Sequence, residues 1–404
     1  MSRLSIVYVW DADYPWDVRT EKIALALTEA GHDVTIVARN RAWKSTSETL
    51  KEGAVRRMKP WRAFGRGGDG LLSFPAFFNP RWVSLITHAC RDTHADLIIV
   101  RDIPLSPTAI WVGKRLGVPV LLDMAENYPA MMSALWETGR HTPLDYAVRN
   151  PSLTARVERM SVRHVDHVVV VVEESAERVR KLGVPADRIT VVSNTPPLDR
   201  LGGESKQVRE QRPRIDVVYM GNLEVVRGLV ESIDAIAILK SRGRMVRLRI
   251  IGRGRDEAVI RQRAADLGLT NDDVEFLGYI ESHADALAIV SASDVGLMPH
   301  RRNDSWNTTI PNKMFDYMAA GIPVVSSDAD PCARILRDTG AGCVFPSGDA
   351  AGIAAAIEEA AAPGARETLG LAGRGAIRET YNWEHDTAVL LEAVADTVAK
   401  ARQN

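Results

Sequence analysis

One structural unit recurs along the chain: an apolar run, a loop, a helical pattern and then a glycine. The first copy places residues 4–9 before a helical pattern over 18–30 that ends at Gly31. Further runs of the same kind occupy residues 33–38, 96–100, 120–122, 167–172, 188–192, 216–220, 247–251, 274–278, 294–298 and 324–327. Apolar runs without alternation, separated by helices, are typical of parallel strands with helices on both faces. We therefore predict an α/β fold with doubly wound sheets.

The unit repeats too many times for one domain. A chain of 404 residues fits two domains, and residues 196–214 are rich in Pro, Gly and charge, as linkers are. We predict a first Rossmann-like domain over 1–195, a linker over 196–214 and a second Rossmann-like domain over 215–382. The helical tail 383–404 is expected to rejoin the first domain. Ligands bind beyond the carboxyl ends of such strands, so we expect two ligands in a cleft between the domains.

Composition narrows the class of protein further. Lys and Arg total 51 against 52 for Asp and Glu, so no overall field favours nucleic acid. The 3 cysteines lack metal-site spacing and fit a reducing compartment. The start of the chain does not resemble a signal peptide, and no run of apolar residues is long enough to span a membrane. We expect a cytoplasmic protein.

Two glycine-bearing turns follow strands of the second half. Gly221 and Asn222 begin a loop that reaches Arg227 and Gly228 at a helix start, where an anion can meet free N–H groups. The same pattern also fits an ordinary loop with a surface arginine. Gly252 and Arg253 begin the second turn, which lacks the third glycine of a dinucleotide fingerprint.

The most unusual segment of the sequence is 307–325. Pro311 follows the small residues Thr308 and Thr309 and suits a helix start with exposed amides. Asp316 lies one helical turn beyond Lys313, so it would bind hydroxyls such as a ribose diol or simply complement the helix dipole. Both interpretations remain open at this point.

Taken in order, these motifs resemble the nucleotide-sugar domain of retaining family-4 glycosyltransferases of the GT-B fold. The resemblance rests on Gly221-Asn222-Leu223, Arg227-Gly228, residues 250–254, Phe276-Leu277-Gly278, and Asp316 before 317–325. The first half matches through residues 31–34 and through Asp123 and Glu126. Asn222 stands where the family usually has Arg, Arg227 where it has Lys, and Thr308 where it has the first of two glutamates.

The resemblance implies transfer of a sugar, with retention and without a metal, from a nucleotide sugar to an acceptor hydroxyl. The acceptor is expected to be a glycan, a lipid-linked molecule or a small molecule, and no cofactor beyond the donor is expected. The phosphates are assigned to Arg227, to the backbone of Thr308, Thr309 and Ile310, and to Lys313 as a helper. Residues expected around the rest of the donor are Gly221, Asn222, Gly252, Arg253, Asp316 for the ribose, and Tyr279 or Ile280 for the base.

The remaining candidates follow strand ends. Asp102 and Glu126 are expected to face the substrate or else to cap their loops, and with Arg227 and Lys313 they form the predicted catalytic set. Arg19, next to the expected N-cap Asp17, could reach a phosphate or be solvated. His300 could contact the donor sugar or be structural. Asp11-Ala12-Asp13 and Asp328-Ala329-Asp330 imitate a metal-binding motif, but without a ligand cluster we take them as loop acids and expect no metal.

Two other functions remain open: a regulatory protein with a degenerate GT-B fold, and a nucleotide-sugar epimerase of the same fold. The substitutions at 222 and 308 keep the first of these open.

A basic and aromatic segment lies in the first half. Between Arg41 and Arg81 there are nine basic and three acidic residues, interleaved with aromatic ones. We predict that residues 54–82 dock on the anionic inner face of the membrane through Trp61 or the Phe77-Phe78 pair. The alternative is a basic loop beside buried strand and helix residues. No nucleic-acid recognition motif accompanies the segment.

Overall fold

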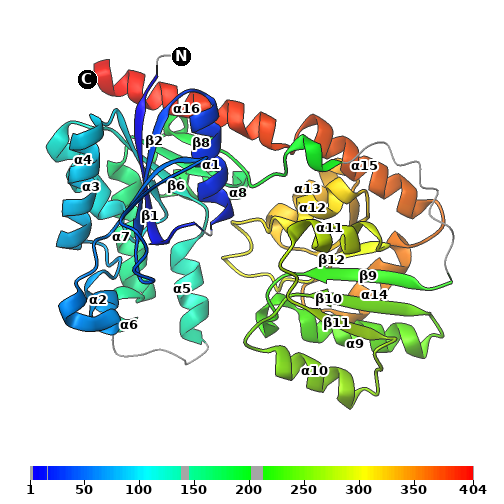
Figure 1. The fold of residues 1–404 in the computed structure, drawn as a ribbon. Helices are drawn as coiled ribbons and strands as arrows, with labels where there is room; N and C mark the ends of the chain where they lie inside the picture. Colours follow the sequence, from blue (N-terminus) through cyan, green and yellow to red (C-terminus); the bar gives the residue numbers. More distant parts are fainter. Residues whose placement is uncertain (1–2, 16, 138–144, 202–212, 404) are drawn as a thin grey trace. The chain divides into compact units, whose positions relative to one another are not determined.

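The chain separates into two compact units. The computed structural model describes residues 3–15, 17–137, 145–201 and 213–403. The first unit contains residues 1–193 and 387–404, and the second contains residues 194–386 (Figure 1). Helix α16 (Trp383–Gln403) begins in the second unit and continues in the first. Within the expected linker, residues 202–212 lie outside the described residues.

The first unit is built on an eight-stranded sheet in the order β3-β4-β2-β1-β5-β6-β7-β8. Its strands are β1 (Ser5–Asp13), β2 (Asp33–Arg39), β3 (Ser47–Leu50), β4 (Gly53–Arg57), β5 (Leu97–Arg101), β6 (Val120–Met124), β7 (His167–Val170) and β8 (Ile189–Val191). All pairings are parallel except that of β3 with β4. Consecutive residues 6–9 of β1 are all fully buried, so both faces of the sheet are covered. The predicted doubly wound architecture is confirmed.

Helices cover this sheet between its strands. They are α1 (Val18–Glu29), α2 (Gly65–Leu72), α3 (Pro80–Thr93), α4 (Ser106–Leu116), α5 (Tyr128–Glu137), α6 (Asp145–Val148), α7 (Pro151–His164), α8 (Glu173–Lys181) and the larger part of α16. The local sequence explains several starts. Asn79 and Asn150 accept hydrogen bonds from helix amides, and each is followed by a proline that suits a first helical position. The expected N-cap Asp17 is confirmed, since it accepts from the Thr20 amide at 2.7 Å.

The region over 41–82 is more ordered than a basic loop. It contains β3, β4 and α2, and it ends in the start of α3. Trp82 is fully buried, and Phe77 packs against the core of the first unit, whereas Phe78 is exposed. Phe77 is thus partly engaged in the core, which leaves Phe78 as the exposed member of the pair, and docking through these residues stays a prediction.

The second unit has a six-stranded, wholly parallel sheet in the order β11-β10-β9-β12-β13-β14. Its strands are β9 (Ile215–Met220), β10 (Val246–Ile251), β11 (Val274–Gly278), β12 (Val295–Met298), β13 (Val324–Ser327) and β14 (Gly342–Phe345). Its helices are α9 (Leu229–Ser241), α10 (Glu257–Asp266), α11 (His283–Ser291), α12 (Lys313–Ala320), α13 (Asp330–Thr339), α14 (Ala350–Ala360) and α15 (Ala365–Glu379). The order of strands reverses between β9 and β12, which is where such sheets bind ligands.

No helix among the described residues combines the length and apolar character needed to cross a bilayer.

Candidate functional site

Backbone hydrogen bonds tie the loops after β9 and β10 to the ends of the neighbouring strands β10 and β11. The Gly221 amide donates to the Ile251 carbonyl at 2.9 Å, and the Gly252 amide donates to that of Gly278 at 2.8 Å. A Cβ at residue 252 would lie 1.9 Å from the Gly221 oxygen. These glycines therefore allow the loops to pack on each other. Their approach to a diphosphate stays a prediction.

Lys313 is the most unusual side chain of this unit. It opens α12 and is only 7% exposed, yet its Nζ has no hydrogen-bond partner among the described residues. The Nζ lies 4.1 Å from the centre of the buried Tyr219 ring, beside Gly221. Burial, reinforced by the charge of Arg227, lowers the pKa of Lys313 well below its ordinary value. A buried amine without a partner is costly, so this position favours an incoming anion.

Two further basic side chains lie near Lys313. His300, which directly follows Pro299 after β12, is 2% exposed, and neither ring nitrogen has a partner in the described part of the chain. Burial first, and then the charges of Lys313 and Arg227, lower the pKa of His300 well below its ordinary value. Arg227 lies in the turn Val225–Arg227, where its Nε donates to Glu224 at 3.1 Å. We call Arg227, His300 and Lys313 the cation cluster.

Trp306 lies against His300 and Arg227 of this cluster, and it is not among the site residues predicted from the sequence. Its ring lies 4.3 Å from that of His300, and the Arg227 guanidinium carbon lies 5.3 Å from the Trp306 ring. No local pattern marks Trp306, because it belongs to an irregular segment between β12 and α12.

The segment before α12 is only partly arranged as expected. The Thr308 amide donates to the Ser305 carbonyl at 3.2 Å, and its hydroxyl donates to Asp304 at 2.8 Å. This amide is therefore already bonded within a turn, and its assignment to the phosphates stays a prediction. Thr309 and Ile310 are buried immediately before Pro311.

Asp316 lies one turn beyond Lys313 and is buried. It accepts from Arg200 at 3.4 Å, a pairing that the sequence did not suggest. Its ribose role stays a prediction, since the carboxylate has a basic neighbour of its own.

Most of the outer candidates for the donor site are exposed. Asn222 is exposed, and its carbonyl accepts from the Tyr219 hydroxyl at 2.8 Å. Arg253 lies over the exposed ring of Tyr279 at 5.6 Å, and Ile280 is half-buried beside it.

Gly228 packs against Pro299, the residue before His300 of the cation cluster, and this contact allows a direct prediction. A Cβ at residue 228 would lie 1.7 Å from the Pro299 oxygen, whereas a Cβ at Gly243 would meet nothing within 4 Å. Both glycines have nearly the same φ, +75° and +72°. We expect Gly243→Ala to lower the free energy of unfolding by about 1–2 kcal/mol, the cost of a left-handed backbone for a residue with a Cβ. Gly228→Ala should lower it clearly more because Pro299 and His300 must move. Urea unfolding of both variants checks this, and equal losses would contradict it.

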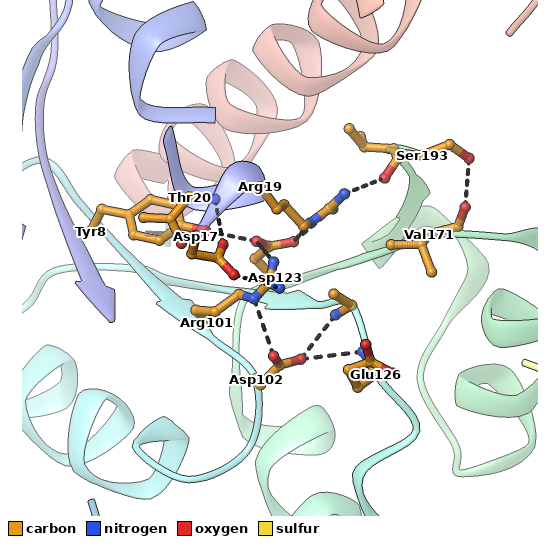
Figure 2. A network of polar contacts seen from close by, with 12 residues as sticks. Tyr8, Asp17, Arg19, Thr20, Arg101, Asp102, Asp123, Glu126, Val171 and Ser193 are labelled. Carbon is orange, nitrogen blue, oxygen red and sulfur yellow. Dashed lines mark hydrogen bonds and ion pairs between the residues drawn. The ribbon is translucent and has the colours of Figure 1, made fainter. Parts of the chain in front are cut away.

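The first unit contains a buried ionic network at the carboxyl ends of β1, β5 and β6 (Figure 2). Asp123 accepts from Tyr8 at 2.7 Å, Arg19 Nε at 2.8 Å and Arg101 Nη1 at 3.3 Å. Arg19 also donates to the Val192 carbonyl at 2.9 Å and is 3% exposed. Arg19 is thus an interior ion-pair partner, so its interpretation as a solvated arginine is wrong, and this pairing leaves it poorly placed for a phosphate.

Asp102 and Glu126 are neighbours in this network. The Asp102 carboxylate accepts from the Ala125 amide at 2.9 Å and the Glu126 amide at 3.3 Å, and it pairs with Arg101 Nε at 3.1 Å. Asp102 has φ +54°, an uncommon value for a residue with a side chain. Burial first, with a contribution from Asp123, raises the pKa of Asp102 despite Arg101. The loop-capping interpretation of Asp102 is therefore realised, and Glu126 is half-buried beside it.

Asp11 is a strand residue and not a loop acid as predicted. It lies inside β1, which extends to Asp13 and not to residue 9 as expected. Burial first, and then the neighbouring Asp102, raise the pKa of Asp11 to about 7. The only signal in the sequence was its position just beyond an apolar run. Among the described residues no three acidic, His or Cys side chains gather where they could share a metal ion.

Family models match both units. Residues 17–195 match the model described as "Glycosyl transferase 4-like domain", and residues 214–362 match the one described as "Glycosyl transferases group 1". Together the two models cover most of the chain, and the pairing agrees with the motifs found in the sequence.

A curated glycosyltransferase is similar to part of the chain. The chain is 33% identical over 185 residues to the phosphatidyl-myo-inositol mannosyltransferase of Mycobacterium leprae, which is 45% of this chain and 46% of that protein. It therefore spans about half the length of this curated relative.

Solved structures agree in fold over nearly the whole chain. Sucrose-phosphate synthase from Thermosynechococcus elongatus has a TM-score of 0.75 at 18% identity, covering 98% of this chain and all of that one. Anabaena HepE in complex with UDP and glucose has a TM-score of 0.70 at 15% identity, with coverage of 98% and 100%.

Proposed function

The chain belongs to the family-4 glycosyltransferases of the GT-B fold, and we propose that it transfers a sugar from a nucleotide-sugar donor to an acceptor hydroxyl. Transfer would retain the anomeric configuration and need no metal. The observation that supports this most is the buried Nζ of Lys313 within the cation cluster, which has no hydrogen-bond partner among the described residues. A nucleoside diphosphate supplies the anion that such a cluster lacks.

The cluster suits a leaving group better than a neutral ligand. As the bond between the sugar C1 and the phosphate oxygen breaks, negative charge grows on the diphosphate. Arg227 would bring a permanent positive charge and Lys313 would take up a proton as the diphosphate binds, and positive groups in a low-dielectric site stabilise that charge strongly. Lys313 would bind a phosphate oxygen, Arg227 would turn from Glu224 toward the phosphates, and His300 would donate from a ring nitrogen to the phosphate or the donor sugar.

The remaining donor contacts follow from the neighbours of the cluster. Asp316 would accept hydrogen bonds from the ribose, and Tyr279 with Ile280 would flank the base. Because HepE is similar in fold and binds UDP and glucose, a uridine nucleotide is the first donor to test. The name of the mycobacterial relative makes a lipid-linked acceptor a suitable class to test.

The reaction balances without an added base. The acceptor oxygen forms a bond to C1 on the face from which the diphosphate leaves, and its proton passes to the departing phosphate oxygen. Asp102 and Glu126, with Asp11 beside Asp102, would hold the acceptor hydroxyls in the first unit.

A thermal-shift screen of UDP, GDP, ADP and CDP tests donor binding. One diphosphate should stabilise the chain by about 2.7 kcal/mol at roughly 100 times its Kd. This corresponds to a rise of about 5–10 °C in the melting temperature of a unit of this size. The matching nucleotide sugar should then be consumed, and NMR of the product should show the anomeric configuration of the donor.

Two lysine variants distinguish the loss of the donor site from the general effect of removing a lysine. Lys313→Met should abolish the shift, whereas Lys240→Met, at an exposed pair with Asp273, should keep it. If no diphosphate raised the melting temperature, the donor assignment would be wrong. Binding without consumption of any nucleotide sugar would favour the regulatory alternative.

A further inference from the structure

Large apolar side chains are exposed around α2 in the first unit. Between residues 61 and 78 the exposed fractions are 46% for Trp61, 59% for Phe64, 60% for Leu71, 38% for Leu72 and 53% for Phe78. A group of this size on a surface usually marks an interaction site.

Ring contacts and a hydrogen bond join these side chains into one surface. The Trp61 and Phe64 rings lie 6.0 Å apart. The Asn79 side chain donates to the Leu72 carbonyl at 3.0 Å, so the loop that carries Phe78 lies against the end of α2. Phe78 meets the exposed Trp111 of α4 edge-on at 5.9 Å. Figure 1 shows α2, α3 and α4 along one side of the first unit.

Basic residues surround the apolar ones. Those that are exposed are Lys59, Arg62, Arg66, Lys114 and Arg115. Arg62 and Arg66 lie over the Trp43 ring at 5.6 and 5.5 Å, and Arg115 lies over Trp111 at 5.5 Å. These contacts set the cations beside the aromatic rings.

The only acid in this stretch of sequence is turned inward. Asp69 is the single acidic residue between Gly53 and Arg91, and it is 3% exposed. It accepts from the Trp61 amide, the Arg81 guanidinium and the Trp43 indole at 2.9, 2.9 and 3.2 Å. Asp69 thus orders the segment without lowering the positive charge of its outer side.

We propose that these residues dock the chain on an anionic lipid bilayer. The basic aromatic surface consists of Lys59, Trp61, Arg62, Phe64, Arg66, Leu71, Leu72, Phe78, Trp111, Lys114 and Arg115. Cations bind anionic headgroups, while aromatic and aliphatic side chains enter the boundary between headgroups and acyl chains. A soluble polyanion would leave Phe64 and Leu71 in water. A second copy would bring two positive surfaces together. An anionic bilayer offers headgroups to the basic side chains and acyl chains to the apolar ones, so it is the occupant that fits this surface.

The docking does not depend on the transfer reaction, so it is tested without donor or acceptor. The full chain is sedimented with vesicles of phosphatidylcholine alone and with vesicles of equal parts phosphatidylcholine and phosphatidylglycerol. We expect binding to the second kind only, weakened at about 1 M salt, where the Debye length falls to roughly 3 Å. A salt-resistant part should remain from inserted apolar groups.

Variants separate the two contributions. Each cation removed should lower partitioning about fivefold, so Arg62→Gln with Arg66→Gln should lose about 25-fold. Phe64→Ser with Leu71→Ser should lose the salt-resistant part and keep the fold, because both side chains are more than half exposed. The matched controls, Arg242→Gln with Arg244→Gln and Met245→Ser with Leu371→Ser, change exposed side chains of the second unit and should bind as the parent chain does.

Three outcomes would overturn the proposal. The first is no sedimentation with anionic vesicles at low salt. The second is equal loss in the control variants. The third is binding to heparin, or self-association blocked by Phe64→Ser with Leu71→Ser, without binding to vesicles, which would assign the surface to a polyanion or to a second copy.

Discussion

Lys313→Met is expected to stabilise the ligand-free chain and to slow transfer strongly at the same time. The stabilisation follows because the Lys313 Nζ is buried without a partner among the described residues, and an unsatisfied buried polar group costs about 1–3 kcal/mol. Methionine fills similar space without that group. Transfer should fall by about 10²–10³-fold in kcat, the usual effect of losing one group that stabilises transition-state charge.

The measurements are calorimetric unfolding and steady-state kinetics on the same preparations. Lys240→Met serves as the control because it removes an exposed lysine paired with Asp273, and such pairs contribute about 0–1 kcal/mol. A variant that lost both stability and activity would show that Lys313 supports the fold, and it would remove the lysine from the proposed donor site.

The pH dependence gives a second measure of the same residue. Because the pKa of Lys313 is lowered in the folded chain, the unfolded chain binds more protons between that lowered value and 10.5. The free energy of unfolding should therefore rise with pH across this window, and Lys313→Met should lack this rise. Binding of a diphosphate should be coupled to proton uptake, which calorimetry in buffers of different ionisation enthalpy detects.

Asp123→Asn is expected to cause the largest loss of stability. Asp123 is fully buried between Arg19 and Arg101, and breaking a buried ion pair by removing one partner costs about 3–5 kcal/mol. For a unit of this size the melting temperature should drop by roughly 10 °C. Asp33→Asn, which breaks an exposed pair with Arg3, is the control and should change little. A small effect of Asp123→Asn would mean that water or other groups compensate the two arginines.

Acid should affect this network in a predictable direction. Burial alone would raise the pKa of Asp123, but the charges of Arg19 and Arg101 outweigh it and hold the pKa below the ordinary 3.8. The stabilisation is therefore present above 3.8 and lost as pH falls through the lowered value. In Asp123→Asn this acid-dependent part should disappear.

Local sequence determined the architecture of both units. Runs such as 97–100 and 295–298 contain no polar side chain, and each is followed by a helical pattern, which is typical of a parallel sheet covered on both faces. The order of motifs along 216–326 also indicates the family. These features follow from neighbours in sequence, which is why they could be read from the chain alone.

Tertiary structure decided the partners of the charged side chains. Arg19 and Asp123 are 104 positions apart, and Asp316 and Arg200 are 116 apart, so no spacing rule relates them. The sequence identified Lys313 and His300 as candidates, but only packing buried their nitrogens away from hydrogen-bond partners within the described part of the chain. In the same way, packing buried Phe77 and Trp82 while leaving Phe78 beside Trp111. Residue type sets what a side chain can do, and burial by distant segments decides which of those properties is used.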